Sequence, residues 1–181
     1  MAQSAGKEER MRYGVSYYPE HKNEEELRHD LELLKHSGIN TVRMGEFAWC
    51  RMEPEEGKYE FGWLEAVVKE LGEAGIQTIL CTPTACPPAW LVKKHPDILY
   101  MDNRRIRRPF GGRRHYCYNN ETYRMYSVKI AEKLGEAFAG NPYVAGVQID
   151  NEPAQEGTGR CCCPVCTEKF HAYLRQEYGS I

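Results

Sequence analysis

The chain reads Gly38-Ile39-Asn40-Thr41-Val42 at one point and Gly75-Ile76-Gln77-Thr78-Ile79 at another. In each copy the glycine ends an amphipathic helical pattern, and the apolar and β-branched residues after it begin a predicted strand. This small internal repeat indicates that one helix-to-strand unit occurs at least twice. Helices that alternate with strands are typical of a parallel sheet with right-handed crossovers.

The same alternation extends along the rest of the chain. Four short apolar segments are predicted strands: Tyr13–Tyr18, Ile39–Met44, Ile76–Cys81 and Val144–Ile149. Four amphipathic patterns are predicted helices: Glu24–His36 with Asn23 as N-cap, Trp63–Glu73, Glu121–Phe138 and Val165–Tyr178. An unusually long connection, about residues 82–120, follows the third strand and carries a further short helix near Ala89–Lys94.

A doubly wound sheet and a TIM barrel both fit this order. No glycine-rich fingerprint follows the first strand, which weakens the nucleotide-binding, doubly wound option. Polar residues gather just after the strands, where barrels carry their active sites. We therefore expect the α/β class and a (β/α)8 TIM barrel. Because a barrel typically needs about 250 residues, we expect a polar tail at 1–12 and a partial barrel at 13–181, with about the first four βα units.

The composition excludes several classes of protein. The chain has 24 basic and 26 acidic side chains and a net charge of −2, so it lacks an overall basic field for nucleic acid. No apolar run approaches the roughly 18 residues of a membrane span. The N-terminus lacks the apolar segment of a signal peptide, so a cytoplasmic location is expected.

Six arginines fall within the long third connection: Arg104, Arg105, Arg107, Arg108, Arg113 and Arg114. Such a cluster beside cysteines could indicate a nucleic-acid module. No helix at recognition spacing lies within the run, and the net charge is acidic. A solvated loop or a subunit interface is the favoured interpretation.

The strongest catalytic signal is Gln148-Ile149-Asp150-Asn151-Glu152-Pro153, where a buried strand ends at an amide and a carboxylate. A half-buried carboxylic acid can have a raised pKa and donate a proton to a leaving group. Neighbouring strand residues point to opposite faces, so the backbone must bend if Asn151 and Glu152 are to face one ligand. The alternative is an ordinary polar start of a loop.

Arg43 lies inside the apolar second predicted strand. A buried arginine is costly unless it is paired, so a carboxylate partner is expected. An ordinary salt bridge at the barrel rim is the competing interpretation. Glu46 and Trp49 follow closely and could line a pocket, although Trp49 could equally belong to the core.

Four of the eight cysteines fall within six residues: Cys161, Cys162, Cys163 and Cys166. In a reducing compartment such a cluster points to metal rather than to disulfides. The spacing C-x-C-x-x-C across Cys161, Cys163 and Cys166 can place three thiolates on one tetrahedral Zn²⁺, with a fourth ligand from elsewhere. His115 is a weak alternative ligand, and a patch of unligated thiols is the alternative to a metal site.

Taken in order, these segments resemble glycoside hydrolase family 42, which comprises bacterial β-galactosidases with a TIM barrel. The matching stretches are GVSYYPE (14–20), RMGEFAW (43–49), PTACPPAWL (83–91), RRHYC (113–117), QIDNE (148–152) and CCCPVC (161–166). They cover nearly the whole chain from Tyr13 onward. The resemblance implies a retaining enzyme that hydrolyses terminal non-reducing β-D-galactosides by double displacement.

Carried over residue by residue, the resemblance makes Glu152 the proton donor and acid/base. It makes Asn151 the ligand of the substrate 2-hydroxyl and places Arg43 in the galactose site. The family nucleophile is a second glutamate beyond Ile181, so the chain alone is expected to be inactive. Family members usually have Phe or Tyr where this sequence has Pro153, which affects how the Glu152 loop is held.

The resemblance also makes Cys117 the fourth ligand of a structural zinc, beside Cys161, Cys163 and Cys166. Four thiolates leave no open position, so this zinc is not catalytic. It would clip the long third connection to the fourth. Cys162 stands where relatives tend to have an aromatic residue and could replace one ligand. The family further suggests a homotrimer.

Two rival functions remain at this point. Another retaining barrel glycosidase, of the cellulase or mannanase kind, would use an open cleft instead of a pocket for galactose. A non-catalytic zinc-binding scaffold would have no second catalytic glutamate.

Overall fold

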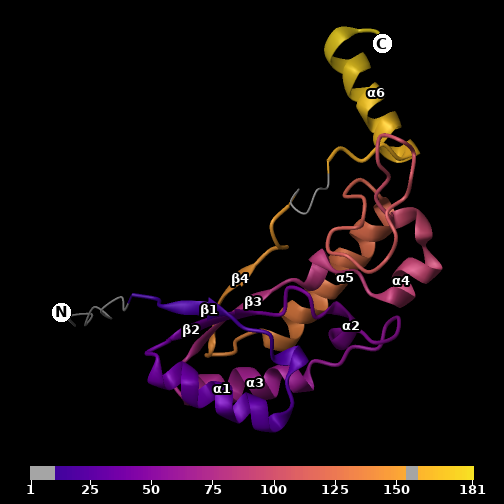
Figure 1. The fold of residues 1–181 in the computed structure, drawn as a ribbon. Coiled ribbons are helices and arrows are strands. Elements are labelled where there is room, and N and C mark those ends of the chain that lie inside the picture. The colour runs from indigo at the N-terminus through magenta and orange to yellow at the C-terminus, as the bar shows by residue number, and fades with distance from the viewer. Residues whose placement is uncertain (1–10, 154–158) are drawn as a thin grey trace, which may run out of the picture.

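A computed structural model describes residues 11–153 and 159–181 of the protein. Four strands form one parallel sheet: β1 (Gly14–Ser16), β2 (Thr41–Met44), β3 (Gln77–Cys81) and β4 (Val144–Gln148). Their order is β1-β2-β3-β4, so each strand lies beside its predecessor in the chain (Figure 1). A doubly wound sheet reverses its strand order at a switch point, and this sheet does not. The arrangement is the N-terminal part of a TIM barrel, as the sequence predicts.

Three helices connect the strands: α1 (Glu24–His36), α3 (Gly62–Glu73) and α5 (Glu121–Phe138). α1 and α3 run side by side along the sheet (Figure 1). The core contains β2 and β3 side chains such as Val42, Met44 and Leu80, together with apolar side chains of α3 and α5. These helices therefore cover the outer face of the sheet, as in a barrel.

The helix ends follow the expected local chemistry. Asn23 accepts hydrogen bonds from the backbone N–H groups of Glu25 and Glu26, and Glu26 completes a capping box. Gly38 and Gly75, the glycines of the repeat, have φ values of 71° and 83°. This left-handed conformation ends each helix and costs little for glycine.

The predicted elements are confirmed with small differences in length. α1, α5 and the short helix α4 (Ala89–Lys94) have the predicted bounds, and α6 (Pro164–Tyr178) begins one residue earlier. Each strand is shorter than predicted by one to three residues, since β-type side chains extend beyond the paired residues at one end or both. The sequence patterns missed α2 (Trp49–Met52), because four residues are too few to show a helical period.

The long third connection is packed rather than free. It contains η2 (Pro83–Ala85), α4 and η3 (Pro96–Ile98), and a bridge pairs Leu99 with Tyr116. Ile98 and Tyr116 are buried in the core. This packing fixes the segment that leads to Cys117.

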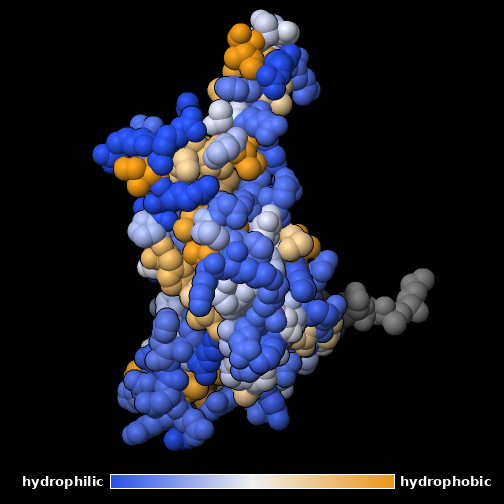
Figure 2. Space-filling view, turned by 90° about the vertical axis from the view of Figure 1, so that its right-hand side faces the viewer, coloured by the Kyte–Doolittle hydropathy of each residue, from blue (hydrophilic) through white to orange (hydrophobic). Residues whose placement is uncertain are grey.

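Part of the sheet remains open within the described residues. Val147 and Ile149 are 61% and 84% exposed, and Val15 at the other end of the sheet is also exposed. α6 stands away from the sheet (Figure 1) and contains no buried residue. Figure 2 shows a mostly hydrophilic surface, with apolar side chains gathered in the upper part of the molecule, around the base and tip of the protruding helix.

None of the helices in the part of the chain that the structure describes is long and apolar enough to cross a membrane.

Candidate active site and metal centre

The backbone bends sharply where β4 ends. Asp150 and Glu152 have φ values of 55° and 41°, in the left-handed region that side chains other than glycine rarely adopt. As a result Asn151 and Glu152 face the same region, and Asn151 Nδ2 lies 3.5 Å from Glu152 Oε2. The predicted bend is confirmed, and it takes the form of a turn with two left-handed residues.

Arg43 joins three strand ends through four hydrogen bonds. Its Nη2 donates to Glu46 Oε1 at 2.7 Å and to Ser16 Oγ at 2.8 Å. Its Nη1 donates to Asn151 Oδ1 at 2.9 Å and to Gln148 Oε1 at 3.1 Å. The expected carboxylate partner is therefore Glu46. The contact with Asn151 makes Arg43 part of the same site and more than a rim salt bridge.

Glu46 is fully buried beneath Arg43, and its negative charge affects the neighbouring Cys81 thiol. Burial, together with the negative charge of Glu46, raises the pKa of the Cys81 thiol to about 12. Cys81 therefore stays protonated at neutral pH and is not a nucleophile. Trp49 belongs to the core: it is fully buried, and its indole N–H donates to Glu53 Oε2 at 2.8 Å.

Arg114 is a site residue that the sequence patterns did not single out. It was expected to be solvated or at a subunit interface, but its side chain is fully buried, so that expectation is wrong for this arginine. Arg114 Nη2 lies 4.0 Å from Glu152 Oε2 in an ion pair. Its guanidinium nitrogens form no hydrogen bond within residues 11–153 and 159–181. The run Gly112-Arg113-Arg114-His115 is polar, so no sequence pattern marks Arg114 as buried.

Two of the other loop arginines make contacts in different places. Arg113 lies over the Phe47 ring, with 4.2 Å between its Cζ and the ring centroid. Arg107 donates to the carbonyl oxygens of Asp97 and Leu99. Arg113 thus contacts the segment after β2 through a cation–π interaction, and Arg107 contacts the segment around η3.

The predicted metal ligands come together in space. The sulfur atoms of Cys117, Cys161, Cys163 and Cys166 all lie within 4.8 Å of one another. Cys117 Sγ lies 3.6 Å from Cys163 Sγ and 3.3 Å from Cys166 Sγ. A tetrahedral zinc with Zn–S bonds of about 2.3 Å requires sulfur atoms about 3.8 Å apart. The four side chains therefore fit one zinc ion with only small adjustments.

The environment favours ionisation of one of these thiols. A hydrogen bond from Cys117 lowers the pKa of the Cys161 thiol, and further hydrogen bonds from the Met101 and Cys163 backbone act in the same direction. A thiolate is the form that binds metal. Among the described residues, this is the only group of three or more potential protein ligands.

Cys162 and His115 lie outside this group. Cys162 Sγ donates to the Arg160 carbonyl at 3.6 Å. His115 is buried, its Nδ1 is hydrogen-bonded to the Gly112 carbonyl, and burial lowers its pKa. In this structure neither replaces one of the four cysteines.

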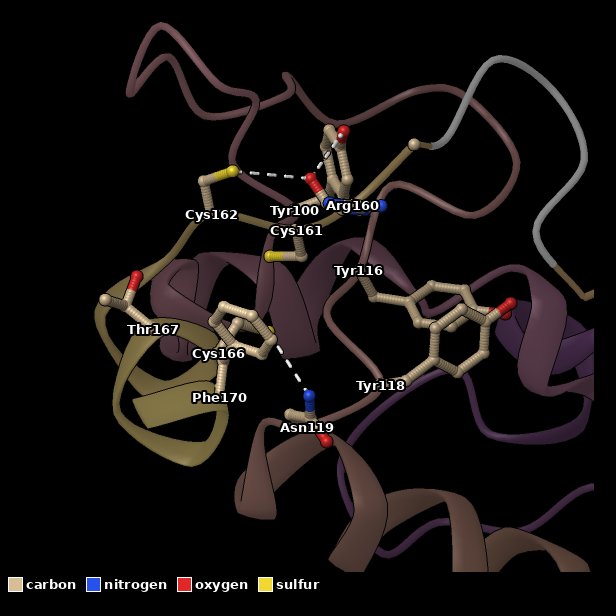
Figure 3. Close-up of a pocket in the computed structure, with 11 residues that line it drawn as sticks. Tyr100, Tyr116, Tyr118, Asn119, Arg160, Cys161, Cys162, Cys166, Thr167 and Phe170 are labelled. Atoms are coloured by element: carbon tan, nitrogen blue, oxygen red, sulfur yellow. Dashed lines mark hydrogen bonds between the residues drawn. The ribbon is translucent and has the colours of Figure 1, made fainter. Parts of the chain in front are cut away.

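A cavity of about 690 Å³ lies beside the cysteine cluster, at a distinct place from Glu152 and Asn151. Figure 3 shows Tyr116 and Tyr118 close together on one side and Cys161 and Cys166 on the other. The two tyrosine rings meet edge to face, with centroids 5.1 Å apart. The cavity walls thus come from both the third connection and the segment after β4.

Comparisons with known proteins agree with this geometry. The model of glycoside hydrolase family 42, described as beta-galactosidase, matches residues 16–181. A beta-galactosidase of Thermus thermophilus is 45% identical over 168 residues, which are 93% of this chain and 26% of that protein. The beta-galactosidase Bga of Halorubrum lacusprofundi is 43% identical over 171 residues, which are 94% of this chain and 24% of that protein.

Solved structures match as well. The polyextremophilic beta-galactosidase from Halorubrum lacusprofundi superposes with a TM-score of 0.88, covering 93% of this chain and 25% of that chain at 43% identity. The beta-galactosidase of the psychrophilic Marinomonas ef1 gives a TM-score of 0.88 at 36% identity, over 93% of this chain and 26% of that chain. The chain spans about a quarter of the length of these relatives. On its sequence, its fold and its match over residues 16–181, the chain belongs to glycoside hydrolase family 42.

Proposed function

We propose that the protein containing this chain is a retaining β-galactosidase that hydrolyses terminal non-reducing β-D-galactosides, with Glu152 as its acid/base. The observation that carries this proposal is the left-handed turn after β4, which lets the Asn151 side chain contact both Glu152 and Arg43. Family membership and the names of the relatives support the substrate class. No relative named above is a cellulase or a mannanase. A non-catalytic scaffold would not need a left-handed turn that holds Asn151 and Glu152 together.

In the proposed reaction, Glu152 donates a proton to the glycosidic oxygen as the bond to the leaving group breaks. A second carboxylate attacks the anomeric carbon and forms a covalent galactosyl intermediate, for which the two carboxyl groups must lie about 5–5.5 Å apart. Water then hydrolyses the intermediate, and Glu152 acts as the base.

We propose that the nucleophile comes from residues outside this chain. Glu46 is fully buried and ion-paired with Arg43, so it is not free to attack a sugar. The Glu152 side chain is 58% exposed, which leaves room for substrate and for further protein to cover it.

Arg43 and Asn151 are the proposed galactose ligands. Hydrogen bonds to Glu46 and Ser16 hold the Arg43 guanidinium before substrate arrives, which reduces the entropy lost on binding. The Asn151 amide nitrogen lies on the side of Glu152, so it can donate to the 2-hydroxyl next to the scissile bond. Arg114 adds a buried positive charge beside the same carboxylate.

We further propose that Cys117, Cys161, Cys163 and Cys166 hold a structural zinc. The ion would supply a cross-link between the third connection and the segment after β4.

We also propose a homotrimer in the cytoplasm. For the trimer, the exposed Phe170, Tyr173 and Tyr178 of α6 offer apolar surface. Light scattering of the full-length protein measures its oligomeric state.

The test of the acid/base assignment is Glu152→Gln in the full-length protein. Lactose needs a proton for its poor leaving group, so its hydrolysis should fall by about 10²–10⁴-fold. A dinitrophenol leaves without a proton, so dinitrophenyl galactoside should give a burst of phenol followed by slow turnover. Azide needs no base, so it should accelerate the slow phase and yield β-galactosyl azide. Equal losses on both substrates, without burst or azide effect, would show that Glu152 is not the acid/base.

A further inference from the structure

Asp150 is the first left-handed residue of the turn, and its backbone is held on both sides. Its N–H donates to Thr82 Oγ1 at 2.8 Å. Its carbonyl oxygen accepts from Gln148 Nε2 at 2.7 Å. With a φ of 55°, Asp150 adopts a conformation that aspartate and asparagine tolerate better than most other side chains. The start of the turn that leads to Asn151 and Glu152 is therefore held at Asp150.

The Asp150 carboxylate is held by the third connection. Its Oδ1 accepts from Thr84 Oγ1 at 3.0 Å and from the Tyr116 hydroxyl at 3.5 Å. A hydrogen bond to an ionised carboxylate is stronger than one between neutral groups. Asp150 therefore connects the end of β4 to a segment 66 positions earlier in the chain.

The two donors are themselves fixed. Thr84 is buried, and its carbonyl oxygen accepts from the Tyr123 hydroxyl at 3.0 Å. The Tyr116 ring stacks on Tyr123 with centroids 4.1 Å apart. Tyr123 belongs to α5 and is buried in the core. The anchor of Asp150 is thus part of the rigid body of the protein.

We propose that Asp150 is a positioning residue for proton transfer: its contacts with Thr82, Thr84 and Tyr116 hold the Glu152 carboxyl at the glycosidic oxygen. This inference rests on the proposed role of Glu152. A general acid must lie within hydrogen-bond reach of the atom that it protonates. A misplacement of about 1 Å can cost about 10²-fold in rate. On the far side of the turn, Arg43 holds Asn151, so the turn is fixed at both of its faces.

The contacts can be removed singly in the full-length protein. Asp150→Ala removes the carboxylate and the left-handed preference, and Thr84→Val removes one donor with little change in shape. We expect both variants to lose about 10–100-fold in kcat/KM for lactose. The burst rate with dinitrophenyl galactoside should change less than about threefold, because that leaving group needs no proton. Azide should accelerate the slow phase, as expected for Glu152→Gln, because azide needs no general base.

Conservative changes should restore the activity. Asp150→Asn keeps an acceptor oxygen and tolerates the left-handed conformation. Thr84→Ser keeps the hydroxyl. Both variants should hydrolyse lactose within about fivefold of the unmutated protein. The matched control is Asp102→Ala in the same long connection. Asp102 also accepts two hydrogen bonds, from the N–H groups of Arg104 and Ile106 at 2.9 Å, yet its loss should leave both substrates unchanged.

Glu152→Gln is measured in parallel and separates the two proposals. If Glu152→Gln shows the leaving-group pattern while Asp150→Ala and Thr84→Val lose both substrates equally, or lose neither, the positioning role is wrong and the acid/base assignment stands. If Glu152→Gln lacks the pattern, the acid/base assignment fails and the positioning role fails with it. Thermal unfolding of each variant identifies any that fail to fold, and for those the Thr84→Val and Thr84→Ser pair decides.

Discussion

Arg43 and Asn151 are 108 positions apart in the sequence, and a hydrogen bond of 2.9 Å joins them. This bond links the end of β2 to the turn after β4. The two proposed galactose ligands therefore contact each other directly. Glu46 in turn accepts a hydrogen bond from Arg43. Loss of Glu46 should therefore affect both folding and substrate binding.

Glu46→Gln should destabilise the full-length protein by about 2 kcal/mol, because it removes the charge partner of Arg43 at a buried position. This value lies below that for a fully buried pair, since Arg43 is partly exposed and has other partners. We expect KM for galactosides to rise by about tenfold. Chemical denaturation and steady-state kinetics measure the two effects. The control is Glu136→Gln, which breaks the surface pair with Lys133 and should change neither. An unchanged KM would contradict the proposed role of Arg43 as a galactose ligand.

The proposed metal centre can be tested with Cys162 as the control, because it is a neighbouring cysteine outside the cluster. The full-length protein, purified without added metal, should contain about one zinc per chain. Cys163→Ser should lose the metal and increase hydrogen exchange in the long third connection. Cys162→Ser should keep the metal, because Cys162 lies outside the cluster. Elemental analysis gives the zinc content. Negligible zinc in the unmutated protein, or equal loss in both variants, would argue against the proposed ligand set.

The 181-residue chain by itself should not hydrolyse nitrophenyl β-galactosides and should self-associate. The proposed nucleophile lies outside it, and Val147 of β4 and Ile149 just after β4 are exposed. Light scattering and an assay at high protein concentration check both points, with the full-length protein as the positive control. Turnover by a monomeric 181-residue chain would contradict the need for a second carboxylate.

Two glycines within helices should respond in opposite ways to alanine. At Gly72 on α3, a Cβ would lie 2.1 Å from the Tyr143 ring, so Gly72→Ala should destabilise the protein by about 1–3 kcal/mol. At Gly135 on α5, nothing lies within 4 Å, so Gly135→Ala should stabilise it by about 0.5–1 kcal/mol. Thermal denaturation of the two variants measures the difference. A neutral Gly72→Ala would mean that Tyr143 moves aside easily.

Local structure was predictable because it depends on residues close together in the chain. The bounds of α1 and α5 follow from apolar periodicity and from the caps Asn23 and Asn120, whose side chains bond backbone N–H groups within three residues. The αL glycines Gly38 and Gly75 mark the helix ends for the same reason. The C-x-C-x-x-C spacing is also local, and it was sufficient to indicate a metal.

Sequence by itself therefore determined the order of elements and the barrel class, and it predicted the Asn151–Glu152 pair as part of the active site. Only the tertiary structure decided that Arg114 is buried beside Glu152 and that Asp150 and Glu152 adopt left-handed φ values. It also decided that the Asp150 carboxylate bonds Thr84. Burial and strained backbone depend on packing between segments that are far apart in the chain, and propensities that act over a few residues do not contain that information.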